Sequence, residues 1–352
     1  MKEEQPLLAP HTPISFKIPT KRTATRFLSF LICLGLLTAV FAVSGVWGNR
    51  QNWFDGGSVP DENKGEGDSL PSMTTLPQNT DAPDAEKQIP TGAIRVISMD
   101  LARDWNSSAF IENQTLYQTN FEELKRAPLT HVGKLGAEPL VLILHTHSAE
   151  AYLPPQTAYL QESIEKTIYS TDEERTVRSV GEALCKSLNQ NGIPTIQCVQ
   201  KHGKDGTLQN AYADSAACIK AYLAQYPSIQ YVIDLHRDGI LSAEGDLVRT
   251  EAQANETSYA QVLAVVGSDG NGTACPNWES NLSLAVQLLS RLNQRVEHLS
   301  RGVSLRNASY NQELAYRSLL LEIGSAGNTC EEAMRTARLV GETLTQMILE
   351  AN

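Results

Sequence analysis

Two patterns of apolar and polar positions alternate along the chain from residue 140 onward. Short continuous apolar runs are typical of strands covered on both faces, and apolar residues at every third or fourth position are typical of helices with one buried face. Their alternation predicts an α/β fold, a single three-layer domain with a mostly parallel central sheet flanked by helices. The predicted strands are 140–145, 193–199, 229–235, 261–267, 302–306 and 318–323, and the predicted helices are 173–190, 208–225, 279–298 and 329–349.

Two of the predicted helices begin with the pattern Ser/Thr-x-x-Glu. Thr171 precedes Glu174 by three positions, and Thr329 precedes Glu332 by three positions. In a capping box of this kind, each of the two side chains accepts a hydrogen bond from a backbone N–H of the first turn. We therefore expect both helices to begin at these boxes.

The N-terminal quarter of the chain has a different pattern. Residues 27–47 are 21 positions without a charge, enough for a helix to cross a hydrocarbon core of about 30 Å. Basic residues precede this run and acidic residues follow it. The positive-inside rule therefore predicts a cytoplasmic segment at 1–26 and a single-pass membrane helix at 27–47, with everything after it outside the cell membrane. A cleaved signal peptide is the alternative.

Residues 48–92 are rich in Gly, Pro, Ser and charged residues and poor in apolar ones. Such a segment cannot bury enough apolar surface to order itself, which predicts a disordered extracytoplasmic tether. Order is expected to begin near the apolar residues 94–99. The remaining stretch, 93–352, is predicted to be one catalytic domain.

Charge limits the partners of this chain. It has 352 residues, 41% of them hydrophobic, and a net charge of −11. An acidic surface argues against a nucleic-acid partner, because binding to phosphates requires a basic surface.

Five cysteines lie outside the predicted membrane helix. None of them forms a CxxC pair, so a thiolate zinc site is not expected. Cys185 and Cys198 could bridge a helix to the next strand, although sequence alone does not settle the pairing of cysteines.

Chemistry-bearing side chains follow three of the predicted strands. His145, His147 and Glu150 come directly after the first strand, His236 follows the third, and Glu322 ends the last. Ligand and metal sites of open α/β sheets lie at such strand ends. A hydrolytic zinc ion needs three protein ligands and one open position for water. The pattern therefore predicts a zinc hydrolase.

In this prediction, His145 or His147 binds the metal together with Glu150 and His236. Sequence spacing does not decide between the first two histidines. Glu322 would be the general base, since a glutamate inside an apolar run is costly unless it is paired or functional. Its alternative is a buried ion pair with Arg237 or Arg306.

For other polar side chains near these strand ends, the sequence predicts less specific roles. Arg237 and Arg306 could hold a carboxylate of the substrate. Asp238 could orient an imidazole or complete the metal shell. We assign no role to His202 or His298.

Five stretches of the chain resemble the stage II sporulation protein P family of endospore-forming bacteria. They occur in the same order and at similar spacing, and the layout of basic N-terminus, membrane helix, tether and exported domain is also similar. The stretches are VLILHTHSAEAY at 141–152, VIDLHRDG at 232–239, NWESNL at 277–282, YNQEL at 310–314 and LLLEIG at 319–324.

The resemblance implies a fold and an activity like those of the zinc N-acetylmuramoyl-L-alanine amidases. Such an enzyme would cut peptidoglycan between muramic acid and L-Ala during sporulation engulfment, with endopeptidase cleavage of cross-links as a further activity. The implied partners are stage II sporulation proteins D and M. Because related amidases carry a ligand glutamate at a helix start, Glu173 and Glu174 are alternatives to Glu150.

An alternative hypothesis keeps the same fold but assigns it no catalytic activity. The domain would then be a non-catalytic module that binds peptidoglycan or a protein partner and activates another wall hydrolase. Metal content separates this reading from the enzyme.

Overall fold

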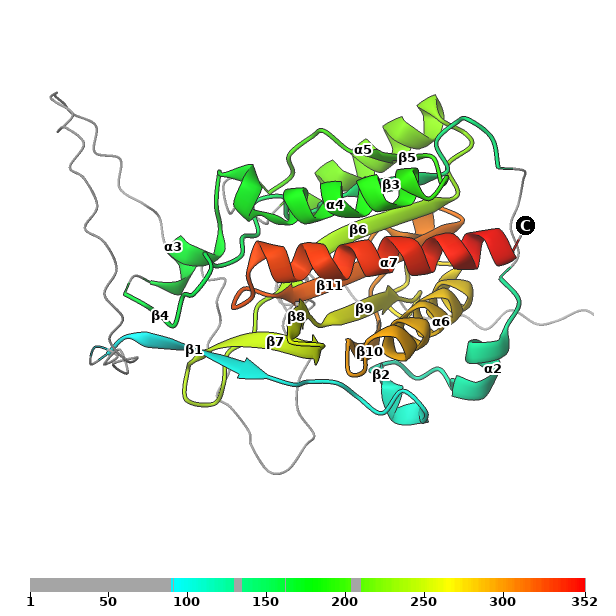
Figure 1. Ribbon diagram of the computed structural model, residues 1–352. Coiled ribbons are helices and arrows are strands. Elements are labelled where there is room, and N and C mark those ends of the chain that lie inside the picture. The colour runs from blue at the N-terminus through cyan, green and yellow to red at the C-terminus, as the bar shows by residue number, and fades with distance from the viewer. Residues whose placement is uncertain (1–89, 91, 130–134, 162, 204–209, 352) are drawn as a thin grey trace, which may run out of the picture. The chain divides into compact units, whose positions relative to one another are not determined.

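A computed structural model describes residues 90, 92–129, 135–161, 163–203 and 210–351 of the protein. They form two β-sheets with helices packed against them (Figure 1). No helix within these ranges has both the length and the apolar character that a membrane crossing requires. The predicted cytoplasmic segment, the membrane helix at 27–47 and most of the predicted tether lie outside the described residues.

A seven-stranded sheet forms the centre of this part of the chain. Its strands, in spatial order, are β2 (Ile111–Asn113), β10 (Ser300–Arg306), β9 (Val262–Gly267), β11 (Arg317–Ser325), β6 (Tyr231–Asp238), β3 (Val141–Leu144) and β5 (Thr195–Gln197). Neighbouring strands are parallel except β9 and β11, which are antiparallel.

A second, four-stranded sheet was not predicted. Its order is β4 (Tyr159–Leu160), β1 (Ile94–Met99), β7 (Leu247–Ala254) and β8 (Thr257–Ala260). Only the β1–β7 pair is parallel. Both sheets are therefore mixed: in the central sheet β2, β10 and β9 run opposite to the other four strands, so the prediction of a mostly parallel arrangement is wrong.

The hairpin β7–β8 explains the reversal in the central sheet. A parallel neighbour requires a crossover, usually a helix, that returns the chain to the starting edge. Between β6 and β9 the chain forms this hairpin instead, with no helix. Strand β9 therefore starts at the edge where β6 ends, and it runs antiparallel to β11.

The six predicted strands and the four predicted helices are all present, which confirms the α/β class. The long helices are α4 (Val177–Gln190), α5 (Ala211–Gln225), α6 (Trp278–Arg295) and α7 (Cys330–Glu350). Short helices α2 (Phe121–Arg126) and α3 (Ile164–Ile168) and the 3₁₀ turns η1 (Ser108–Phe110), η2 (Glu173–Arg175) and η3 (Gln312–Leu314) complete the described set.

One of the two predicted capping boxes is confirmed. The Thr329 side chain and the Glu332 side chain satisfy each other's backbone N–H groups at the start of α7. The box predicted at Thr171 is wrong, because η2 intervenes and α4 begins only after it. There the side chain of Thr176 accepts from the Arg178 N–H and caps the helix.

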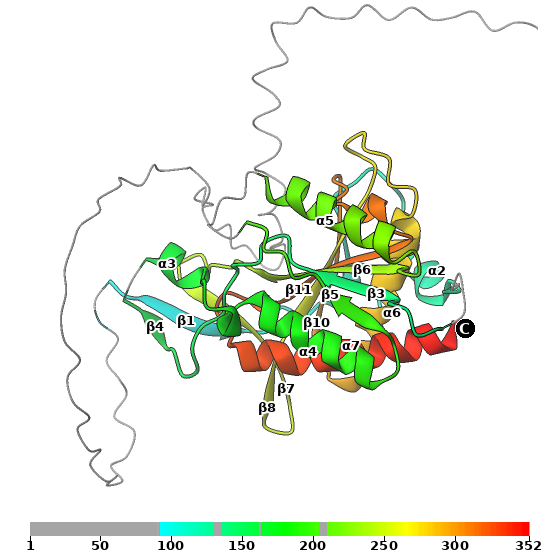
Figure 2. The same cartoon turned by 90° about the horizontal axis from the view of Figure 1, so that it is seen from above.

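Helices cover the two faces of the central sheet unequally. Figures 1 and 2 show α4 and α7 on one face and α5 on the other. Apolar side chains alternate accordingly along the strands. Val141 and Ile143 of β3 join the larger core with α4, α6 and α7, whereas Leu142 and Leu144 join a smaller core with Ile219 of α5.

Strands of both directions therefore have their ends at one edge of the central sheet, and polar side chains lie there. Strands β3, β6 and β11 end there, and β9 and β10 begin there. The candidate site residues follow or end β3, β6 and β11, so the fold brings them to the same edge.

Candidate metal centre

Strand β6 sets the orientation of the site. Successive strand side chains point to opposite faces, so Asp234, His236 and Asp238 share a face with Val232. Val232 belongs to the smaller core beneath α5. The three polar side chains therefore lie on the α5 face of the sheet.

The segment after β3 meets this face. The Asp234 carboxylate accepts hydrogen bonds from the Thr146 N–H at 2.9 Å and from the Thr146 hydroxyl at 2.6 Å. The Ser148 N–H donates to the His202 carbonyl oxygen at 3.0 Å. The contacts with Asp234 hold the loop that carries His147 and Glu150 against β6, and the contact with His202 joins it to the segment after β5.

His147, Glu150 and His236 converge into one cluster. One ligand atom from each residue lies within 4.8 Å of the others, and all three side chains are buried. Glu150 Oε1 is 3.4 Å from His147 Nδ1, and Glu150 Oε2 is 3.3 Å from His236 Nδ1. Two imidazoles and a carboxylate form a donor set that zinc commonly uses.

Charges in this cluster shift the pKa values of its members. Burial would raise the pKa of Glu150, but the positive charges of His236 and Arg237 outweigh it and hold the pKa well below its usual range. Burial would lower the pKa of His236, but Asp234 and Glu150 raise it well above its usual range. The cluster thus favours an ionised carboxylate surrounded by positive charge, and a cation could replace the proton on His236.

Asp234 lies beside the ring nitrogen of His236 that is not next to Glu150. Its Oδ1 lies 3.0 Å from His236 Nε2, as an ion pair rather than an aligned hydrogen bond. Metal-binding histidines commonly place their second ring nitrogen against a carboxylate, which orients the ring. This role of Asp234 was not predicted, although its position two residues before His236 on one strand is a signal in the sequence.

His145 lies away from the cluster. Its Nδ1 is 2.9 Å from the Leu235 carbonyl oxygen, which can only accept, so Nδ1 carries the proton. Its Nε2 is 2.8 Å from Gln197 Nε2, which donates to it. Both ring nitrogens are satisfied, and burial lowers the pKa of His145 to about 4. The structure therefore favours His147 over His145 as a ligand.

Glu322 ends beside the cluster on β11. It pairs in register with His236 across the two parallel strands. Burial, reinforced by the charge of Asp238, raises the pKa of Glu322 to about 8. The predicted alternative, an ion pair with Arg237 or Arg306, is absent from the ion pairs of the described residues.

Several polar atoms here are buried without a hydrogen-bond partner among the described residues. They include His147 Nε2, Glu322 Oε2 and the hydroxyl of Tyr212 on α5. The Tyr212 ring packs edge-on against His147, with ring centroids 5.8 Å apart. Buried polar groups are normally paired, so these orphaned atoms fit a metal ion and its water. The residues present therefore fit the implied zinc.

The two predicted substrate arginines make hydrogen bonds within the protein. The Arg237 guanidinium donates to the carbonyl oxygens of Ala151, at 3.1 Å, and Ile168, at 2.6 Å. Its backbone N–H also donates to Glu150 Oε2 at 3.2 Å. Arg237 thus holds the Glu150 loop in place, and its contact with substrate stays a prediction.

Arg306 lies at the far end of β10. It pairs with Gly267, four residues beyond the Leu263 that pairs with Glu322, or about 13 Å along the strand. Its guanidinium donates to Gln114. Arg301 begins the same strand at the site edge and donates to Asp238 at 2.8 Å, so Asp238 pairs with an arginine rather than an imidazole.

The alternative ligands Glu173 and Glu174 lie outside the cluster. Both are exposed, and Glu173 pairs with Arg178 and Lys201. The structure therefore brings Glu150, and neither alternative, to the histidines.

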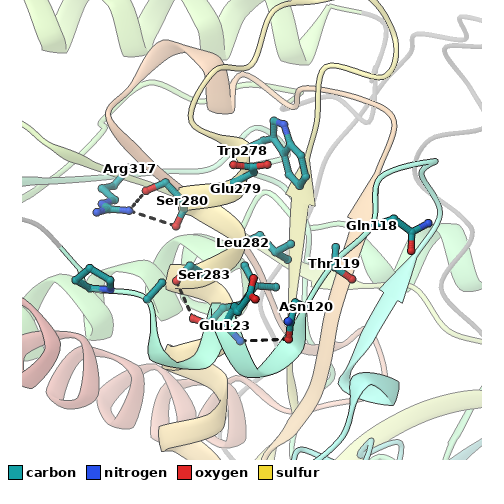
Figure 3. A pocket seen from close by; sticks show the side chains of 13 residues that line it. Gln118, Thr119, Asn120, Glu123, Trp278, Glu279, Ser280, Leu282, Ser283 and Arg317 are labelled. Carbon is teal, nitrogen blue, oxygen red and sulfur yellow. Dashed lines mark hydrogen bonds between the residues drawn. The ribbon is translucent and has the colours of Figure 1, made fainter.

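A surface pocket elsewhere is separate from this centre. It lies between α2 and α6, where Trp278, Ser280 and Arg317 contribute to its lining (Figure 3). Arg317 is at the start of β11, and Glu322 is near the end of that strand. The pocket shares no residue with the His147, Glu150 and His236 cluster.

The fold and the site together define an α/β domain with a buried two-histidine, one-glutamate cluster and an unpaired glutamate beside it. A sequence model of the family "Stage II sporulation protein P" matches residues 77–345 of this chain. The chain belongs to that family.

A curated relative supports the same membership. Stage II sporulation protein P of Bacillus subtilis (strain 168) is 30% identical over 226 residues, which are 61% of this chain and 53% of the relative. The chain therefore spans about half the length of the curated relative it matches.

Solved structures of N-acetylmuramoyl-L-alanine amidases show a weaker likeness. The Mycobacterium abscessus enzyme has 15% identity and a TM-score of 0.35, covering 60% of this chain and 98% of its own. The Clostridium difficile 630 enzyme has 13% identity and a TM-score of 0.35, covering 61% of this chain and 97% of its own. Scores of this size do not establish a shared fold.

Proposed function

We propose that this chain is a zinc-dependent N-acetylmuramoyl-L-alanine amidase that degrades septal peptidoglycan during sporulation engulfment. The observation that carries the proposal is the convergence of His147, Glu150 and His236 beside the unpaired Glu322. Family membership supports the sporulation context and the peptidoglycan substrate.

His147, Glu150 and His236 would hold the zinc ion. When bound, zinc supplies Lewis acidity, which polarises a carbonyl and lowers the pKa of water. Asp234 keeps the His236 ring oriented, and Arg237 fixes the Glu150 loop through its backbone and side-chain hydrogen bonds. These residues keep the ligand set in one arrangement.

Glu322 would move the proton. It accepts a proton from the attacking water as the water oxygen bonds to the lactyl carbonyl carbon. It then donates that proton to the L-Ala nitrogen as the C–N bond breaks. A pKa of about 8 suits this exchange, because a group that titrates near the operating pH can both take and release a proton.

The location and the partners of this chain are proposed from its sequence. A membrane helix at 27–47 would anchor the chain with its N-terminus in the cytoplasm, and the tether would let the domain reach the wall. We propose stage II sporulation proteins D and M as partners at the septum. Protease accessibility in intact cells would test the orientation, and co-purification from sporulating cells would test the partners.

Release of soluble material from purified peptidoglycan tests the enzyme. The metal-depleted chain should release none, and added zinc should restore release. Glu322→Gln should lower the rate by about 100-fold or more while zinc content stays as in wild type. His147→Ala should lose both zinc and activity.

The exposed Glu182 of α4 provides a matched control, since Glu182→Gln should leave both measurements unchanged. A zinc-loaded wild-type chain that binds peptidoglycan without releasing material would contradict the proposal and favour the binding module. Near-normal activity in Glu322→Gln would show that another group moves the proton.

A further inference from the structure

A second group of metal-ligating side chains lies outside the proposed catalytic centre. Cys198 directly follows β5, Cys218 lies in α5, and His202 lies in the segment between them. One ligand atom from each lies within 4.8 Å of the others, and all three are buried. None of them has a part in the proposed amide hydrolysis.

The separation of these atoms is close to that of a zinc site. Around a tetrahedral zinc, two sulfurs or a sulfur and a nitrogen lie about 3.5–3.8 Å apart, from bond lengths of about 2.3 Å to sulfur and 2.0 Å to nitrogen. Side-chain rotations that move each ligand atom by less than about 1 Å would bring atoms 4.8 Å apart to that spacing. Two thiolates and an imidazole are ligands for which zinc has high affinity.

The histidine of this group keeps one ring nitrogen available to a metal ion. His202 Nδ1 lies 3.1 Å from the His145 carbonyl oxygen, which can only accept a hydrogen bond. Nδ1 therefore carries the proton, and Nε2 of the neutral ring keeps its lone pair. A backbone carbonyl in this position is the usual partner that fixes the tautomer of a metal-binding histidine.

A fourth atom that could bind a metal lies beside both sulfurs. Gln200 Oε1 is 3.1 Å from Cys198 Sγ and 3.7 Å from Cys218 Sγ. Buried cysteines often pack as small apolar residues, and Cys198 and Cys218 do belong to the core beneath α5. Apolar packing alone does not require an oriented histidine and a side-chain oxygen at the same point.

We propose that Cys198, His202 and Cys218 form a second zinc site, with Gln200 Oε1 or a water as the fourth ligand. It is a structural site, because its ligands are buried and it joins the segment that follows β5 to α5. The catalytic proposal does not depend on it.

The second site would stiffen the catalytic loop. His202 accepts from the Ser148 N–H at 3.0 Å and from the Ser148 hydroxyl at 2.8 Å through its carbonyl oxygen, while its ring donates to the His145 carbonyl. Ser148 and His145 flank His147 closely in sequence. A metal on His202 would therefore fix the backbone that presents His147.

Metal stoichiometry of the full chain, purified with a phosphine reductant and loaded with zinc, tests the proposal. Wild type should hold two zinc ions per chain. Cys198→Ser and His147→Ala should each hold one, and the double variant none. Loaded with cobalt, wild type and His147→Ala should show the thiolate-to-cobalt charge-transfer band, and Cys198→Ser should lack it.

Alkylation of wild type gives a measurement that does not depend on whether a variant folds. Zinc should protect Cys198 and Cys218 from iodoacetamide, as mapped by mass spectrometry, by at least about tenfold in rate. Cys185, on α4, is the matched control, since Cys185→Ser should still hold two zinc ions. One zinc per wild-type chain that Cys198→Ser retains, unprotected thiols, or a Cys198–Cys218 disulfide that resists the reductant would overturn the proposal.

Discussion

Replacing Glu322 by Gln should make the metal-free protein more stable at neutral pH. Glu322 has a buried, unpaired Oε2, and burial raises the pKa of its carboxyl from 4.5 to about 8. A carboxyl whose pKa is raised by folding destabilises the folded state wherever the pH exceeds its unfolded pKa. Gln has nearly the same shape and no charge to lose, so it removes this cost.

The size of the effect follows from the shift. At pH 7 the unfolded carboxyl is ionised, while the folded one is still mostly protonated. The interval from 4.5 to 7, at about 1.4 kcal/mol per pH unit, gives a cost of about 3 kcal/mol. The gain from Glu322→Gln should therefore be near zero at pH 4.5, grow as the pH rises, and level off above about pH 8.

Guanidinium unfolding at a series of pH values measures this difference. Both proteins are treated with a chelator and followed by tryptophan fluorescence, and the free energies of unfolding are extrapolated linearly. The exposed control Glu182→Gln should show no such rise. A Glu322→Gln difference that stays constant between pH 5 and 9 would refute the description of Glu322 as a strained, unpaired carboxyl.

Three further substitutions test the surroundings of the site. Asp234→Asn should weaken zinc binding by about 10- to 100-fold, measured by competition with a chromogenic chelator. Gly181→Ala should cost about 1–3 kcal/mol in chemical unfolding, because the new Cβ would lie 2.5 Å from the His145 ring; Gly136→Ala, which meets nothing within 4 Å, should cost far less. Thr329→Ala should lower stability by about 1 kcal/mol through loss of the α7 capping box, and an unchanged melting temperature would contradict that role.

Local patterns in the sequence were sufficient for the elements that are strongly apolar or strongly periodic. Strands β3, β6 and β11 and helices α4 to α7 follow from apolar runs and helical spacing. The β7–β8 hairpin was missed, because its strands carry polar side chains at many positions and give no continuous apolar run. That omission also caused the wrong prediction for strand direction, since the hairpin sets the direction of β9.

The candidate site was predicted in composition but not in detail. His145 and His147 are two positions apart, so sequence periodicity alone could place either one in the site. The structure separates them through the Leu235 carbonyl and Gln197, which satisfy the His145 ring. These are contacts between residues about 50 to 90 positions apart, and no local pattern encodes them.

The cysteine pattern shows the same limit. A search for CxxC pairs detects zinc ligands that are neighbours in sequence. Cys198 and Cys218 are twenty positions apart and meet only because α5 packs over the end of β5. The expectation of no thiolate metal site therefore rested on spacing alone, whereas tertiary packing brings both cysteines to His202.

The masses of the products released from purified peptidoglycan test the central claim most directly. If the His147, Glu150 and His236 cluster and Glu322 cut the bond between muramic acid and L-Ala, the zinc-loaded chain should release stem peptides with a free L-Ala amine and leave bare glycan strands. Release should fall by about 100-fold or more in Glu322→Gln. Products that keep sugar and peptide joined, or near-normal release in Glu322→Gln, would contradict the account.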